Sequence, residues 1–190
     1  MTGGPRSASD FHVAGLRLLG ERGRDGLTIA ALCKRLRVTK GSFYHHFGSM
    51  PAFVDQLFVF WETDQATRLA ALPRAEGHPG ERLEFLVDAA LELPHDVEAA
   101  IRAWGGIDPN IAVVQARVDR RRERRVADTL VGLGLDREHA RKLARLAVNT
   151  LIGAQLRDEA ADWRRMRNLL DELARLMLRD IPRARAARRR

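Results

Sequence analysis

Residues 28–50 read TIAALCKRLRVTKGSFYHHFGSM, and this stretch decides the fold. It holds two short amphipathic patterns joined by a tight turn at residues 36–38. In the first pattern, apolar residues recur at the i, i+3, i+4 and i+7 positions of one helical face: Ile29, Leu32, Cys33 and Leu36. Thr28 stands where an N-cap belongs. The stretch therefore predicts a helix-turn-helix.

The second helix of this stretch has two unlike faces. Phe43 and Phe47 are four residues apart and share a face that can be buried. Lys40 and Tyr44 share another face, and Ser42 lies beside them. A helix with aromatic rings on one side and hydrogen-bonding groups on the other is suited to lie on DNA.

Gly41 and Thr39 strengthen this interpretation. Glycine lowers helix propensity by ~1 kcal/mol relative to alanine. A purely structural helix would gain nothing in return for this cost. Without a side chain at Gly41, a groove wall can approach the backbone closely. Thr39 is a candidate N-cap, and it leaves backbone N–H groups free to meet a phosphate. A preceding helix with the same apolar spacing completes a three-helix head: Phe11, Ala14, Gly15 and Leu18.

Residues from about 8 to 60 resemble the DNA-binding domain of the TetR family of bacterial transcriptional regulators. The resemblance rests on LTIAALCKRLRVTKGSFYHHFGSMPAFVDQLF, in which GSFYHHFGS is the most specific part. The later segment AIRAWGGIDPNIAVVQARVDRRRERRVADTLVGLGLD resembles a C-terminal domain found in some members.

The resemblance implies roles for residues of the second helix and its surroundings. Those that would face the major groove are Lys40, Gly41, Ser42 and Tyr44. Those at positions of phosphate contacts are Thr28, Thr39, Tyr44, His45 and His46. The chain departs from the family at Met50, where a lysine often reaches a phosphate, and this implies one phosphate contact fewer per subunit.

The composition agrees with a polyanionic partner. Lysine and arginine total 33 against 25 acidic residues, which gives a formal net charge of +8. Cys33 is the only cysteine, so no internal disulfide can form, and its place on an apolar stripe indicates a small core residue. No apolar run reaches the ~18 residues of a membrane span, and the N-terminus lacks the apolar core of a signal peptide. We expect a bacterial cytoplasmic protein.

Proline and glycine divide the remaining chain into further helical patterns, and no strand alternation is seen. The patterns cover residues 50–72, 80–93, 96–105, 109–132, 136–157 and 162–179. The predicted fold is all-α, with about nine helices. We expect a DNA-binding domain at 8–49, a helical effector and dimerisation domain at 50–180, and a basic, disordered tail at 181–190.

Two apolar stripes near the C-terminus predict a dimer interface. The last helix carries one stripe, at Trp163, Met166, Leu170, Leu173 and Met177, which Leu169 and Leu176 widen. The helix before it carries Leu143, Ala147, Leu151 and Ala154. The alternative is that both stripes pack on their own chain. We expect a homodimer through a four-helix bundle, as the resemblance also implies, and an inverted-repeat operator read by two heads ~34–36 Å apart.

The body offers a candidate ligand pocket but no cofactor or metal site. Trp61, Phe85 and Trp104 come from three predicted helices and can line an apolar pocket, with ordinary core packing as the alternative. The resemblance implies a small-molecule effector, which nothing in the sequence identifies. The arginines of residues 120–125 point around their helix and are interpreted as solvated surface.

Other classes of function are less well supported by the sequence. No HExxH, paired-cysteine or GxSxG pattern is present, and adjacent His45 and His46 point ~100° apart on a helix, so we expect no enzyme. A nonspecific architectural DNA-binding protein stays open as an alternative to a sequence-specific regulator, since net charge alone allows it. The ratio of affinities for selected and random duplex distinguishes them.

Overall fold

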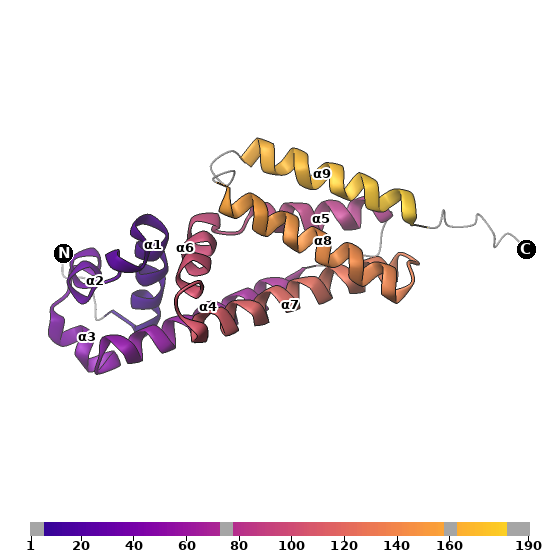
Figure 1. Ribbon diagram of the computed structural model, residues 1–190. Helices are drawn as coiled ribbons and strands as arrows, with labels where there is room; N and C mark the ends of the chain where they lie inside the picture. The colour runs from indigo at the N-terminus through magenta and orange to yellow at the C-terminus, as the bar shows by residue number, and fades with distance from the viewer. Residues whose placement is uncertain (1–5, 73–77, 158–162, 182–190) are drawn as a thin grey trace, which may run out of the picture. The chain divides into compact units, whose positions relative to one another are not determined.

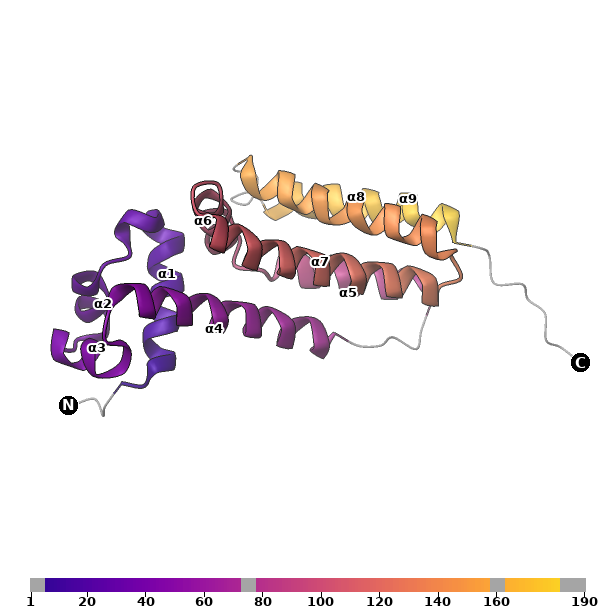
Figure 2. The same ribbon diagram turned by 60° about the horizontal axis from the view of Figure 1, so that its bottom comes forward.

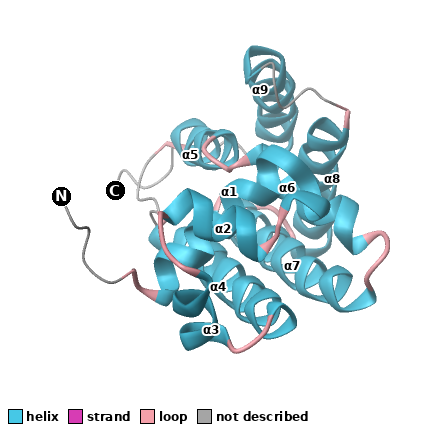
Figure 3. Cartoon of the chain, turned by 90° about the vertical axis from the view of Figure 1, so that its left-hand side faces the viewer, coloured by secondary structure: helices cyan, strands magenta, loops and turns pink. Residues whose placement is uncertain are grey.

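The structure is a computed structural model that describes residues 6–72, 78–157 and 163–181. All regular structure in these ranges is helical (Figures 1 and 3). The helices are α1 (Ala8–Gly26), α2 (Ile29–Leu36), α3 (Lys40–Phe47), α4 (Met50–Ala71), α5 (Pro79–Leu91), α6 (His95–Gly105), α7 (Pro109–Gly132), α8 (Arg137–Leu156) and α9 (Trp163–Asp180). The predicted all-α class, with about nine helices, is confirmed. The predicted tail at 181–190 lies outside the described residues except for Ile181.

The predicted N-caps are confirmed by their hydrogen bonds. Thr28 Oγ1 accepts from Ala31 N at 3.1 Å, and Thr39 Oγ1 accepts from Ser42 N at 3.4 Å. Each cap satisfies one of the backbone donors that the first turn of a helix leaves free. These two threonines therefore fix where α2 and α3 begin.

The helices form two compact units. The head unit comprises Met1–Thr67 with Pro94–Val118, and the body unit comprises Arg68–Leu93 with Asp119–Arg190. Helices α4 and α7 each contribute to both units (Figure 2). This division of contacts places α6 with the head, whereas the sequence grouped residues 96–105 with the body. A functional boundary at residue 50 stays a prediction.

The head unit is built on a cluster of aromatic rings. Phe47 lies at the centre, with ring centroids 5.5 Å from Phe11, 5.2 Å from Phe43 and 4.9 Å from Phe53. These four rings come from α1, α3 and α4, so they hold α3, the second helix of the helix-turn-helix, against α1 and α4. Helix α1 packs on α2 and, more extensively, on α6.

The body unit packs α5 against α9, and α9 also contacts α8 (Figure 1). Leu83, Leu130 and Met177 belong to one buried cluster of this unit, and Val87, Leu151 and Met166 belong to another. An ion pair between Arg167 Nη2 and Asp88 Oδ1, at 2.5 Å, ties α9 to α5.

The arginine run of α7 corrects the prediction of a solvated surface in part, since Arg120 and Arg124 are exposed but other members are not. Arg122 is only 6% exposed and pairs with Asp119. Arg125 Nη2 donates to the carbonyl oxygen of Leu72 at 2.9 Å, at the end of α4. This acceptor is 53 residues away in sequence, and the helical spacing of the run gives no indication of it.

Candidate nucleic-acid interface

The turn between α2 and α3 is held by backbone geometry. Arg37 adopts the left-handed conformation, with φ 57°, and its N–H donates back to the end of α2. The N–H of Val38 donates to the carbonyl oxygen of Cys33 at 3.0 Å. These bonds close α2 in the manner of a helix C-terminal motif, which usually uses glycine at such a position. The turn sets the angle at which α3 leaves α2.

Helix α3 has the two faces that the sequence predicted. Phe43 and Phe47 are buried, whereas Tyr44 is 51% exposed. Lys40, Gly41 and His45 are also exposed, and Ser42 is half-buried. The residues predicted to meet the major groove therefore lie at or near the surface of one short helix, with the aromatic core directly behind it.

The capping threonines can bind phosphate without giving up their caps. Thr28 and Thr39 are exposed, and each uses its hydroxyl oxygen as an acceptor for a backbone N–H. A hydroxyl that accepts one hydrogen bond still has its own proton to donate. That proton is a suitable donor to a phosphate oxygen at the start of a helix, where the helix dipole also favours an anion.

His46 has a partner within the protein that the sequence did not predict, and its phosphate contact stays a prediction. Its Nε2 lies 2.8 Å from the carbonyl oxygen of Arg6, and its ring packs 5.6 Å from that of Phe11. The predicted phosphate contact through this nitrogen would require the bond to Arg6 to break. The structure gives His46 the role of holding the segment before α1, and it leaves His45 exposed. The carbonyl is 40 residues away in sequence, so helical spacing could not indicate it.

Cys33 links the two helices of the motif, as expected of a core residue. It is buried, and its Sγ donates to the carbonyl oxygen of Thr39 at 3.5 Å. Burial raises the pKa of this thiol, and the nearby Lys40 opposes that shift. The thiol is therefore a packing group rather than a reactive one.

Glu21 and Arg35 join α1 to α2 on the outside of the head. The Arg35 guanidinium donates to both carboxylate oxygens of Glu21, and this lowers the pKa of Glu21. Arg35 is thereby engaged within the protein. Lys34 and Arg37, which the sequence interpretation did not assign to DNA, are exposed beside the motif and add to its positive charge.

The three candidate pocket aromatics are divided between the two units. Trp61 is 1% exposed and Trp104 is buried with it in the core of the head unit, where Phe58 lies 6.5 Å and 5.3 Å from them between ring centroids. Phe85 belongs to the body unit and is 48% exposed. The two tryptophans are core residues, as the alternative interpretation has it, because both are buried in one cluster with Phe58.

The predicted dimer stripes are also used mainly within one chain. The buried members are Leu151, Ala154, Met166, Leu170 and Met177, and the half-buried members that pack against the same clusters are Leu143, Ala147 and Leu173. The side chain of Trp163 lies outside the described residues. The five buried side chains are covered by their own chain, so for them the assignment to a dimer interface is corrected in favour of packing within one chain. For the three half-buried side chains, an interface role stays a prediction.

Four leucines remain on the surface of α8 and α9, and two of them, Leu169 and Leu176, are those that widen the predicted stripe. They are between 42% and 59% exposed: Leu146, Leu156, Leu169 and Leu176. Gly153 lies on the same face of α8 by helical spacing, and a Cβ built there meets no atom within 4 Å. This is the apolar surface that the body unit does not bury itself.

The described residues hold neither a metal-binding cluster nor a membrane-spanning helix. No group of three or more histidine, cysteine, aspartate or glutamate residues there is placed to hold a metal ion. None of the helices in those ranges is both long enough and apolar enough to cross a membrane.

The helix-turn-helix, its exposed α3 face and the capped helix starts define the head as a DNA-binding domain of a transcriptional regulator. Residues 13–57 match the family described as "Bacterial regulatory proteins, tetR family". Over this stretch the chain is similar to the TetR family of regulators. No curated protein sequence matches the chain.

Solved structures share the fold at low sequence identity. A transcriptional regulator from Rhodococcus sp. Rha1 is 20% identical, with a TM-score of 0.75 over 92% of this chain and 97% of that one. Escherichia coli NemR in its reduced form is 18% identical, with a TM-score of 0.72 over 92% and 97%. A TetR transcription regulator from Haloarcula marismortui is 16% identical, with a TM-score of 0.72 over 90% and 97%. The likeness extends beyond the head to nearly the whole chain.

Proposed function

We propose that this DNA-binding regulator is a repressor that binds a palindromic operator as a homodimer and is released by a small-molecule effector. The observation that carries the proposal is the division of α3 into a buried aromatic face and an exposed polar face. The aromatic face fixes the helix, so the polar face is presented to DNA in one orientation. The working compartment is the bacterial cytoplasm, where the operator is.

Base reading centres on Lys40. Its ammonium group donates to the N7 and O6 of a guanine, the acceptors that this base shows in the major groove. Tyr44 and Ser42 contact a neighbouring phosphate or a thymine methyl group. Thr28 and Thr39 donate their hydroxyl protons to phosphates, with His45 as a further contact, and so set the register.

The homodimer is proposed to use the exposed leucines of α8 and α9. Leu146, Gly153 and Leu156 follow one face of α8, and Leu169 and Leu176 follow one face of α9. Two copies of this surface related by a two-fold axis give a four-helix bundle, since a two-fold interface pairs the same patch on both subunits. Glycine at the centre of the α8 face permits close approach of a second helix.

A selection from random duplex DNA tests the proposal. The wild type is compared with a Lys40→Ala, Tyr44→Ala double variant and with Lys142→Ala, which removes an exposed lysine of α8 from the body unit. We expect an inverted repeat to be enriched by the wild type and by Lys142→Ala, but not by the double variant. Tight, salt-sensitive binding without enrichment would instead support the alternative, a nonspecific architectural DNA-binding protein.

A further inference from the structure

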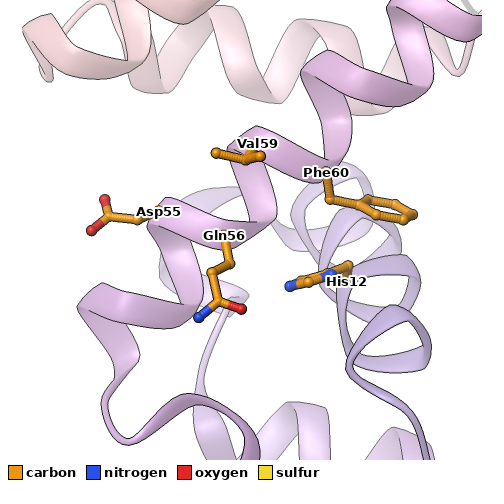
Figure 4. A pocket seen from close by; sticks show the side chains of 5 residues that line it. All are labelled: His12, Asp55, Gln56, Val59 and Phe60. Atoms are coloured by element: carbon orange, nitrogen blue, oxygen red, sulfur yellow. The ribbon is translucent and has the colours of Figure 1, made fainter.

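The head unit contains a hollow that none of the proposed DNA contacts uses. It has a volume of about 320 Å³ and is lined by one residue of α1 and four of α4: His12, Asp55, Gln56, Val59 and Phe60 (Figure 4). All five belong to the head unit, so that unit alone forms the hollow. Its exposed lining is almost entirely apolar.

His12 forms the floor of the hollow and has an unsatisfied nitrogen. It is 8% exposed, and its Nε2 has no hydrogen-bond partner among the described residues. The ring lies among aromatic neighbours, at centroid distances of 5.8 Å from Phe53 and 5.1 Å from Phe60. Burial of a polar nitrogen without a partner is costly, and such a group in a native fold calls for an explanation.

Gln56 supplies a second hydrogen-bonding group at the same place. Figure 4 shows its side chain extending into the gap between α1 and α4, on the side toward which a nitrogen of the His12 ring points. Gln56 and Val59 are exposed, and Val59 is 65% exposed. The nitrogen of His12 is itself buried. A small molecule can therefore reach it only when lining side chains move, and the exposed Gln56 and Val59 can do so at little cost in packing.

The charges around the hollow select the kind of ligand. Burial lowers the pKa of His12, which keeps the imidazole neutral and able to accept a hydrogen bond. The only charged lining residue is Asp55, whose carboxylate repels an anion. The His12 ring is stacked on Phe53 and lies 5.1 Å from the Phe60 ring between centroids, so an aromatic ligand would extend an existing group of rings. A neutral aromatic ring with one hydroxyl group fits this combination.

We propose that the hollow between α1 and α4 is a binding site for small neutral phenols. The phenol hydroxyl donates to Nε2 of His12 and accepts from the amide of Gln56, while its ring lies against Val59 and Phe60. The site is separate from any effector site of the body. The site adjoins Phe53, whose ring packs on Phe43 and Phe47 of α3. Binding of a phenol would therefore affect the packing of α3.

The experiment is a titration of the full-length protein with phenol, followed through the imidazole resonances of His12 by NMR. We expect saturable shifts. Toluene, which lacks the hydroxyl group, and benzoate, which is an anion, should each bind at least about tenfold more weakly, the equivalent of one hydrogen bond.

Two variants and a matched control complete the test. His12→Leu removes the acceptor, and Val59→Trp fills the hollow from an exposed position, so neither variant should retain phenol binding. Because His12→Leu lacks the imidazole resonance, its binding is measured as the rise in Tm that phenol causes, and no rise is expected. Val113→Trp is the control, since Val113 is also exposed and lies in the head unit away from the hollow. Shifts that stay linear in phenol concentration, equal binding of toluene, or unchanged binding in Val59→Trp would overturn the proposal and leave only a water on His12. No DNA is present, so the outcome is independent of the proposed operator.

Discussion

Replacing Gly41 with alanine should make the free protein slightly more stable and its complex with DNA weaker. Gly41 is the second residue of α3 and is exposed. A Cβ built there lies 3.6 Å from Thr39 Oγ1, its nearest neighbour, which is ordinary van der Waals contact. Nothing in the free protein therefore requires glycine at this position. We expect glycine to be required at this position only in the complex, where the wall of the DNA groove comes close to the backbone.

The magnitudes follow from these two environments. In the free protein, alanine gains helix propensity, at most about 1 kcal/mol and less in a first turn. In the complex, a methyl group forced against a closely packed groove costs about 1–3 kcal/mol, by analogy with overpacking in a protein core. This corresponds to a loss of affinity of about 5-fold to 150-fold for each head.

Gly80 provides a matched control. It is the second residue of α5, and a Cβ built there lies 3.4 Å from His78 Nδ1, so its local setting resembles that of Gly41. Urea denaturation should give both alanine variants a midpoint equal to or above that of the wild type. Binding to the selected operator should weaken only for Gly41→Ala. Wild-type affinity in a stably folded Gly41→Ala would refute the close approach of DNA at this residue.

Four further predictions concern other parts of the chain. Lys40→Ala should cost about 1–3 kcal/mol of operator binding and relax preference at one base pair of each half-site, and uniform weakening on all sequences would make Lys40 a phosphate contact. Gly15→Ala should destabilise the head by up to about 2 kcal/mol despite better helix propensity, because its Cβ would lie 2.8 Å from Cζ of the buried Phe53, and adding Phe53→Leu should restore stability. Gly153→Ala should raise monomer stability by about 0.5–1 kcal/mol yet weaken the dimer in analytical ultracentrifugation, while an unchanged dimer would exclude close approach there. Because burial lowers the folded-state pKa of His12 below its ordinary 6.5, the unfolded chain binds this proton more readily. Stability from this group is thus full above pH 6.5 and lost below it, by at most about 1.4 kcal/mol per pH unit, and His12→Leu should lack this loss in urea titrations at pH 7.5 and 5.5.

Local signals in the sequence were sufficient for the helices and for the faces of α3. Proline and glycine punctuate the body at nearly every break, so the predicted and observed helices agree within about two residues at most ends. Phe43 and Phe47 are buried as their spacing predicts, because an eight-residue helix with two phenyl rings on one face has only one apolar side to cover. The threonine caps could be predicted equally well, because each depends on a hydrogen bond to a residue only three positions away.

The errors arose where partners are distant in sequence. Met166 and Leu169 are both apolar members of α9, yet the first is fully buried and the second exposed. A sequence stripe shows that a helix has an apolar side, but not whether the cover comes from its own chain or from a second one. The contact of α5 with α9 decides this, across about 80 residues. Arg125 was misassigned for the same reason, and the contact of His46 with Arg6 could not be foreseen, since both acceptors are backbone carbonyl oxygens far along the chain.

In the proposed function, helix α4 is the element through which an effector of the body would act on DNA binding. It runs without interruption from Met50 to Ala71, and its residues after Thr67 belong to the body unit. Near its start, Phe53 is fully buried, with its ring 5.5 Å from Phe43 and 4.9 Å from Phe47 between centroids. A buried aromatic cluster of this kind does not deform gradually, because close-packed rings tolerate little change in separation. Displacement of α4 therefore carries α3 with it. The same packing that presents Lys40 and Tyr44 in one orientation makes that orientation depend on α4.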